Sequence, residues 1–293
     1  MNAIAMMPNR QKLADKAMQA AIATRLKAKQ DLVTPICIYG VAQALGVRVT
    51  FNDINMEGMY QRGSPPRIHL SSLRPQGRRT YNCAHELGHH VLGHGSSIDE
   101  LREHQTHRPW DVPDEYSADT FAGFLLMPTL GLRSAFVTRG ITPQTASPLE
   151  LYQIGCQFGV GYASLVTHLL WGERMISQAR ARTLRAHTPK TIRAALLGPA
   201  PSQPLIVVDA AWSSPTIDVD VGHHILAATH VNSRSDAVVH VADLPAGRLF
   251  EARRPGLAQL FCETTQWAAF ARVMRPRYVG RAEFRHLEDA PND

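Results

Sequence analysis

The spacing of apolar residues in the N-terminal part of the chain predicts helices followed by strands. Residues 8–31 are an Ala- and Lys-rich helical stretch, and residues 34–45 form a short helix. A strand over residues 47–51 follows, and residues 55–70 form two strands joined by a turn rich in Gly, Ser and Pro. We interpret the later strand, residues 67–70, as an edge strand, which either pairs with an extended peptide or is merely the boundary of a sheet.

Two longer helices are predicted next. The first begins near residue 77, after a proline, and ends at Gly95, and its apolar residues recur at helical spacing. The second begins around residues 111–115, where proline and acidic residues suit a first turn, and it ends before Pro128. At helical steps it presents one stripe that we expect to face the first helix: Glu115, Asp119, Ala122 and Leu126.

The first of these helices carries the sequence His85-Glu86-Leu87-Gly88-His89. Two histidines four residues apart lie on one face of a helix, about 5.4 Å apart along its axis, and can bind one metal ion. Glu86 is one position round the helix, where its carboxylate can hold a water molecule rather than the metal. Zinc lowers the pKa of a coordinated water to about 7, and a carboxylate can then take the proton. This is the H-E-x-x-H arrangement of zinc peptidases.

Glu115, on the second helix, is the candidate third ligand. Two histidines and one glutamate leave the fourth position open, as a catalytic zinc site requires. Asp119, one turn further on, can accept the second ring N–H of a ligand histidine and fix its tautomer. The alternative is that both acids are ordinary residues of a helix N-terminus, favoured by the helix dipole. Their position downstream of the H-E-x-x-H helix favours the ligand role.

Other polar residues nearby are weaker candidates. A third histidine ligand of the metzincin kind would lie one residue after His94, so His94 is not expected to bind the metal. His90 points about 100° away from His89 and is interpreted as a surface residue, solvated or hydrogen-bonded. His104 and His107 lie in the connection between the two helices and can approach the mouth of the site, although nothing in the sequence fixes them there. Candidate donors to the oxyanion of a substrate are Tyr60, Tyr116 and His107.

Five short segments form a further pattern: residues 56–60, 66–70, 84–94, 115–119 and 121–128. Together they resemble the ImmA/IrrE family of metallopeptidases over roughly residues 30–170, and the last segment, ending in Leu-Leu-Met-Pro, is the most diagnostic. The resemblance implies a thermolysin-like zinc core with ligands His85, His89 and Glu115 and with Glu86 as general base. Gly123 stands where the family has alanine, a change between small residues. Members of this family are bacterial or phage-encoded proteases that cleave partner transcriptional repressors.

The rest of the chain predicts a second helical segment and then strands. Residues 148–171 read as helix, glycine-containing turn and helix, a helix-turn-helix-like shape. Few side chains of its second helix can read bases, so packing or partner recognition is favoured over DNA reading. A strongly basic stretch, residues 174–193, follows. From residue 204 short apolar runs predict a strand-rich domain, in which residues 257–274 look helical.

The C-terminal part also contains a possible second metal-binding group: Asp218, Asp220, His223 and His224. Alternating Asp and Val is more typical of a half-exposed strand, so this group carries little weight. Residues 195–293 hold 9 Lys or Arg and 11 Asp or Glu, net −2, whereas residues 1–194 hold 22 and 14, net +8. The basic part can attract an acidic partner, or nucleic acid bound by that partner, although a solvated basic face explains it equally well.

Composition is that of an ordinary globular protein. The chain has 293 residues, of which 44% are hydrophobic, enough for two or three domains. It contains no run near the 18 or more apolar residues of a membrane span, and its first residues lack the basic and apolar parts of an export signal. Four widely spaced cysteines without a C-x-x-C pair indicate reduced thiols and a cytoplasmic location.

These observations predict an α+β fold: a zincin-like metallopeptidase core, a helical helix-turn-helix-like segment and a strand-rich mixed C-terminal domain. The expected domains are residues 1–140 with an N-terminal helical arm, residues 141–195 with a basic linker, and residues 196–293, a candidate sensory domain. The expected function is Zn²⁺-dependent cleavage of a specific protein partner, a DNA-binding repressor, to switch gene expression. The alternative is a zinc-containing regulatory module that sequesters a partner or contacts DNA without proteolysis. Glu86 argues against it, because a structural zinc site needs no base.

Overall fold

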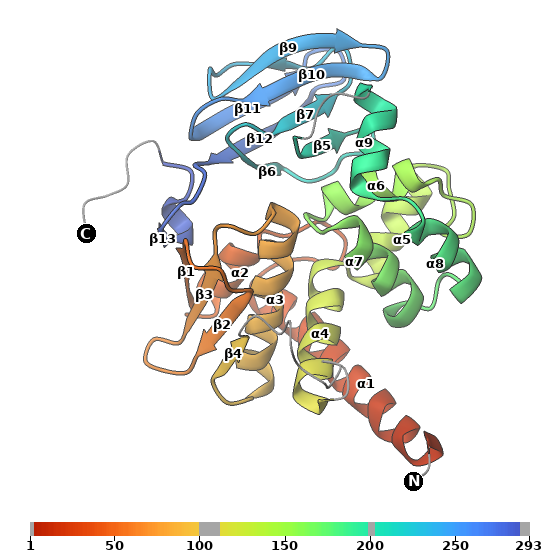
Figure 1. Cartoon of the computed structure of the whole chain (residues 1–293), viewed down its shortest axis with the longest axis vertical. Coiled ribbons are helices and arrows are strands. Elements are labelled where there is room, and N and C mark those ends of the chain that lie inside the picture. The colour runs from red at the N-terminus through yellow and green to blue at the C-terminus, as the bar shows by residue number, and fades with distance from the viewer. Residues whose placement is uncertain (1–2, 100–111, 199–202, 288–293) are drawn as a thin grey trace. The chain divides into compact units, whose positions relative to one another are not determined.

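The computed structural model describes residues 3–99, 112–198 and 203–287, and its helices and mixed sheets confirm the α+β class (Figure 1). The chain divides into two compact units. Unit 1 is Met1–Gly131 with Val279–Ala282, and unit 2 is Leu132–Tyr278 with Glu283–Asp293. The division into three domains expected from the sequence stays a prediction.

Unit 1 contains the predicted H-E-x-x-H helix and its neighbours. Its helices are α1 (Ala3–Lys27), α2 (Ile38–Ala44), α3 (Gln76–Leu92) and α4 (Pro113–Leu126). Helix α1 packs along α4, and α3 packs between α4 and the sheet. Helix α5 (Thr129–Thr138) follows α4 and continues into unit 2.

The sheet of unit 1 has the strand order β13-β1-β3-β2-β4. The strands are β1 (Arg48–Asn52), β2 (Gly58–Gln61), β3 (Arg67–Ser71), β4 (Ser97–Asp99) and β13 (Gly280–Arg281). β1 and β3 are parallel, whereas β2 is antiparallel to both β3 and β4. The predicted edge position of residues 67–70 is therefore wrong, because β3 is paired on both sides. A sequence shows that a segment is a strand but not which strands will flank it, since pairing depends on contacts far along the chain.

One face of this sheet supplies the core beneath α3. Val49, Phe51, Ile68 and Leu70 alternate with polar residues along β1 and β3, and all four are buried. Helices α2 and α3 contact these strands and cover that face. Apolar residues recur at every second position in the strands and about every 3.6 positions in α3, and together they form one apolar layer.

Arg25 anchors the end of α1 inside unit 1. Its side chain is fully buried, and its guanidinium donates from Nε to the Asp31 carbonyl (2.7 Å), from Nη1 to the Leu125 carbonyl (2.6 Å) and from Nη2 to the Thr34 carbonyl. Burial lowers the pKa of Arg25 to about 10, although the neighbouring Asp31 acts in the opposite direction. The guanidinium remains charged at neutral pH and satisfies a carbonyl at the C-terminal end of α4.

Unit 2 begins with helices. They are α6 (Pro148–Gln157), α7 (Tyr162–Thr167), α8 (Gln178–Arg185) and α9 (Pro189–Leu197), and α7 continues as a π-helical turn over His168–Gly172. The predicted helix, turn and helix of residues 148–171 are present, with Gly159 in the left-handed region in the turn. The basic stretch 174–193 forms most of α8 and α9, whose first turns are capped by Ser177 and Thr188.

The remainder of unit 2 is two four-stranded sheets. One has the order β5-β7-β10-β9 and the other β6-β12-β11-β8. Their strands are β5 (Leu205–Val208), β6 (Thr216–Asp220), β7 (His224–Ala227), β8 (Asn232–Ser233), β9 (Val238–Leu244), β10 (Gly247–Ala252), β11 (Gly256–Cys262) and β12 (Trp267–Met274). A single apolar cluster takes residues from both sheets, including Ile225, Phe250, Leu260 and Val273.

Unit 2 differs from the sequence expectation in its last two strands. The helix expected over residues 257–274 is wrong: β11 and β12 form an antiparallel pair there. Leu, Ala, Gln and Met favour helices locally, but the pairing of β12 with both β11 and β6 overrides that preference. The Asp218 carboxylate accepts hydrogen bonds from Arg272 and Arg285, so it belongs to an ion-pair cluster.

The described residues include no single helix that is long and apolar enough to cross a membrane. The bent pair α4 and α5 passes that test only when both helices are taken together.

Candidate metal centre

Helix α3 begins and ends where local sequence signals place it. Pro75 precedes its first residue, and Gly93 follows its last with a φ of 77°. This left-handed conformation is easily adopted by glycine, which has no Cβ. The residue that caps the helix is thus Gly93, two residues before the predicted Gly95. Its Cys83 and Leu87 side chains are fully buried, and the helix contacts β2 and β3 of the sheet.

Helices α3 and α4 cross at very short distance. A Cβ built on Gly88 would lie 3.1 Å from the Ala118 Cα and 3.0 Å from Phe121 Cδ1. A larger residue than glycine does not fit there without movement of the α4 backbone. Because Ala118 is one turn after Glu115, this crossing brings the Glu115 carboxylate to the histidines beside Gly88.

Three predicted ligands converge at this crossing. His85 Nε2 lies 3.1 Å from His89 Nε2 and 3.3 Å from Glu115 Oε2, and His89 Nε2 lies 3.8 Å from Glu115 Oε1. One ligand atom from each residue lies within 4.8 Å of the others. In a tetrahedral zinc site with bonds of about 2.1 Å, ligand atoms are about 3.4 Å apart. The donor types and their spacing therefore fit a divalent metal such as zinc.

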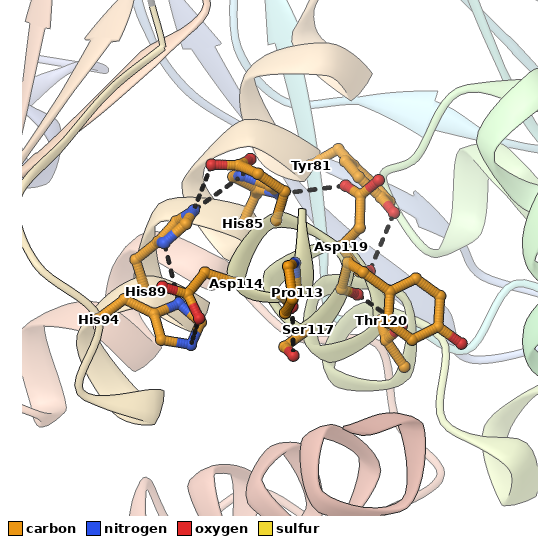
Figure 2. Close-up of polar contacts among 11 residues, drawn as sticks. Tyr81, His85, His89, His94, Pro113, Asp114, Ser117, Asp119 and Thr120 are labelled. Carbon is orange, nitrogen blue, oxygen red and sulfur yellow. Dashed lines mark hydrogen bonds and ion pairs between the residues drawn. The ribbon is translucent and has the colours of Figure 1, made fainter. Parts of the chain in front are cut away.

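Asp119 supports His85 from the side opposite the ligand group. Its Oδ1 lies 3.1 Å from His85 Nδ1, the contact expected from the sequence (Figure 2). Burial lowers the pKa of His85, but the hydrogen bonds to Asp119 and Glu115 outweigh it and raise the pKa well above its usual value. A cation at this site is thus strongly favoured by the carboxylates around it. With a proton on Nδ1 shared with Asp119, the Nε2 atom of His85 faces the ligand group.

The ring of His89 is contacted at Nδ1 by another histidine. Its Nδ1 lies 3.0 Å from Nδ1 of His94, and Nε2 of His94 lies 3.5 Å from Oδ1 of Asp114 (Figure 2). Burial lowers the pKa of His94 despite the nearby Asp114 carboxylate. Sequence reasoning excluded His94 as a ligand but did not find this contact. The available signal was Gly93, because a left-handed residue after a helix turns the following residue back towards it.

The side chain of Glu86 extends from α3 to Gly58, the first residue of β2. It is fully buried, and a Cβ built on Gly58 would lie 2.9 Å from its Oε1. The start of β2 is held against α3 by Asn82, whose Nδ2 donates to the Glu57 carbonyl (2.9 Å) and to Glu57 Oε2 (3.0 Å). Arg78 also donates to Glu57 Oε2, at 2.7 Å. Gly58 therefore lies directly against the candidate base, and sequence reasoning did not single it out.

Residues 42–169 match the family model described as the IrrE N-terminal-like domain of peptidase family M78. This stretch is therefore similar to the M78 family. The match contains α3, α4 and all four residues predicted to act in the site, and it confirms the resemblance read from the sequence. It ends at residue 169, in the π-helical turn that follows α7, so the strands of unit 2 lie outside it. No curated protein matches the chain.

The structure does not bring every candidate to the ligand group. The Tyr60 hydroxyl lies 2.9 Å from Nδ1 of His90, and the guanidinium of Arg10 lies over the Tyr116 ring. These contacts of the two tyrosines are with residues other than His85 and His89. His104 and His107 lie outside the described residues. The oxyanion donor named from the sequence therefore stays a prediction.

Proposed function

We propose that this chain is a zinc-dependent endopeptidase that cleaves a specific protein partner. The observation that supports it most is the convergence of His85, His89 and Glu115, with ligand atoms within 4.8 Å, on the helix pair that also carries Glu86. Structural zinc sites have four protein ligands, whereas this group, among the described residues, has three. Three ligands suit a site that must also accept a substrate.

Each of the four residues has a distinct role in this proposal. His85, His89 and Glu115 hold Zn²⁺, which when bound polarises the scissile carbonyl and makes water a stronger acid. Glu86 accepts a proton from the attacking water on its carboxylate, and later delivers it to the nitrogen of the leaving amine. Asp119 holds His85 in the tautomer that presents Nε2.

The proposed substrate is a flexible loop of a DNA-binding repressor, cut once so that gene expression changes. The ImmA/IrrE resemblance is the basis for this part of the proposal, together with the implied zincin-like core. The net charge of +8 over residues 1–194 suits an acidic partner. We propose that cleavage takes place in the cytoplasm.

The test is co-expression of the full chain with each DNA-binding repressor encoded beside it, followed by intact-mass measurement of all products. Wild type is compared with Glu86→Gln, and with Glu263→Gln as a matched control, since Glu263 is exposed and lies after β11. We expect wild type and the control to cut one bond in one repressor. Glu86→Gln should bind zinc equally and cleave slower by a factor on the order of 10²–10⁴.

A regulatory module that sequesters its partner gives another result. Wild type and both variants would then leave every repressor intact, and one repressor would be recovered in a stable complex with the zinc-loaded chain. Direct contact with DNA would appear as binding whose affinity falls steeply with salt. Cleavage by Glu86→Gln at the wild-type rate would exclude Glu86 as the base.

A further inference from the structure

We propose that His94, supported by Asp114, is a positioning residue for the metal ligand His89, as Asp119 is for His85. The inference rests on the metal site of the proposed function. It concerns how this chain holds the ring of His89, whose Nδ1 lies 3.0 Å from Nδ1 of His94. His94 itself has no place among the three ligands.

The end of α3 brings His94 back to His89. The His94 N–H donates to the His89 carbonyl (3.0 Å), and the Gly93 N–H donates to the His90 carbonyl (3.3 Å). These two bonds, with Gly93 in the left-handed region, form a Schellman motif. The backbone of His94 is therefore fixed on the same residue that its ring contacts. The arrangement depends on a helix end of defined geometry rather than on a free loop.

The ring contact dictates which nitrogens carry protons. If Nε2 of His89 binds a metal, the proton of that ring is on Nδ1, which must donate. Nδ1 of His94 lies within hydrogen-bond distance, at 3.0 Å, and when it accepts this bond the His94 proton lies on Nε2. That N–H points towards Asp114 Oδ1, 3.5 Å away. Each ring is thus held in a single tautomer from Asp114 to the metal site.

His94 and Asp114 are expected to contribute unequally to metal binding. The His94 side chain is only 13% exposed, whereas that of Asp114 is 63% exposed. Water competes for the Asp114 carboxylate, so its interaction with His94 contributes little. We therefore expect His94 to account for most of the effect on metal binding and Asp114 for a small part.

His90 offers a matched control within the same turn of α3. It is also a half-buried histidine, but its Nδ1 lies 2.9 Å from the Tyr60 hydroxyl. Loss of its ring removes a comparable volume and one hydrogen bond from the same end of the helix. A purely structural effect of either histidine would therefore appear equally in both variants.

The experiment measures zinc affinity of the full chain by competition with a chromophoric chelator. The variants are His94→Leu, which removes the acceptor, His94→Asn, whose side-chain oxygen can replace Nδ1, and the control His90→Leu. We expect His94→Leu to weaken zinc binding by roughly ten- to a hundredfold. His94→Asn should recover most of that loss, and His90→Leu should bind zinc as wild type does.

The visible spectrum of the Co²⁺-loaded chain gives a second readout, because it reports the geometry of the ligands themselves. It should change in His94→Leu and remain as in wild type for His94→Asn and His90→Leu. Equal zinc affinity and equal spectra in all variants would overturn the positioning role while leaving the proposed function intact. A wild-type chain that binds no zinc would overturn both. If His94→Leu does not fold, unchanged zinc affinity in a folded His94→Ala variant would overturn the role in the same way.

Discussion

Gly88 of α3 lies directly against Ala118 of α4. A Cβ built on Gly88 would be 3.1 Å from the Ala118 Cα and 3.2 Å from its carbonyl oxygen. Both are backbone atoms, so they cannot move aside as the end of a side chain can. His89 follows Gly88 in the chain, and Glu115 precedes Ala118 by one helical turn. The absence of one methyl group thus sets the distance between the ligands supplied by the two helices.

Gly88→Ala should therefore weaken metal binding and destabilise unit 1. At an open helical position the change would stabilise by up to about 1 kcal/mol, but forcing a methyl into a packed crossing costs about 1–3 kcal/mol. Competition titration with zinc and amide hydrogen exchange of α3 and α4 measure the two effects. Gly40→Ala is the control, because its added Cβ meets no atom nearer than 4.0 Å. A Gly88→Ala chain as stable and as zinc-avid as wild type would show that the crossing is not tight.

The metal-binding group could be predicted from the sequence because its determinants are local. His85 and His89 share a helix, and Glu115 and Asp119 share another, so helical periodicity places each pair on one face. Only the meeting of the two helices had to be assumed. In the structure the two helices pack closely at Gly88, a role that no local sequence pattern predicts.

Other features depend on contacts that no local pattern encodes. Residues 67–70 were expected at a sheet edge, and β3 is an inner strand because β2 folds back and pairs with it. Residues 257–274 were expected to be helical, and they form a hairpin whose inner positions, such as Leu260 and Val273, join a core built from both sheets. In both cases the partner strand decides the outcome.

Gly58→Ala should impair catalysis without impairing metal binding. The new methyl would lie 2.9 Å from Glu86 Oε1, the end of a flexible side chain that can move. The carboxylate would then be displaced from its position, and a displacement of about 1 Å can cost on the order of a hundredfold in rate. Cleavage of the identified partner measures the rate, and chelator competition measures zinc affinity. In the control Gly63→Ala, in the turn between β2 and β3, the nearest atom is 3.5 Å away, and both quantities should stay as in wild type. Unchanged cleavage by Gly58→Ala would mean that Glu86 does not act from this position.

Arg25→Met should destabilise unit 1 by about 3 kcal/mol. The change removes three hydrogen bonds donated by a charged group and leaves three carbonyls, among them that of Leu125 in the buried bond, without these donors. Hydrogen exchange of peptides from α1 and α4 measures the loss, since these helices pack on each other. Lys12→Met, an exposed position of α1, is the control and should change stability by less than about 0.5 kcal/mol. Equal protection in the two variants would contradict the anchoring role of Arg25.

Asp218→Asn should remove an acid-sensitive part of the stability of unit 2. Burial alone would raise the pKa of Asp218, but Arg285 and Arg272 lower it to about 2. Because the folded pKa lies below the unfolded value of about 3.9, the carboxylate stabilises the fold fully above that value. This contribution, about 2 kcal/mol, is lost as the pH falls through about 4 towards 2.

Urea unfolding followed by tryptophan fluorescence measures this effect, since Trp212 is buried in the core of unit 2. Wild type and the exposed-site control Glu263→Gln should lose stability between about pH 5 and pH 2. Asp218→Asn should be less stable at neutral pH and show a flatter profile over the acid range, because an amide does not titrate there. If the unfolding free energy falls as steeply with decreasing pH in Asp218→Asn as in wild type, other carboxylates account for that fall. The bidentate hydrogen bond from Arg272 (2.8 and 2.6 Å) then does not couple folding to protonation of Asp218.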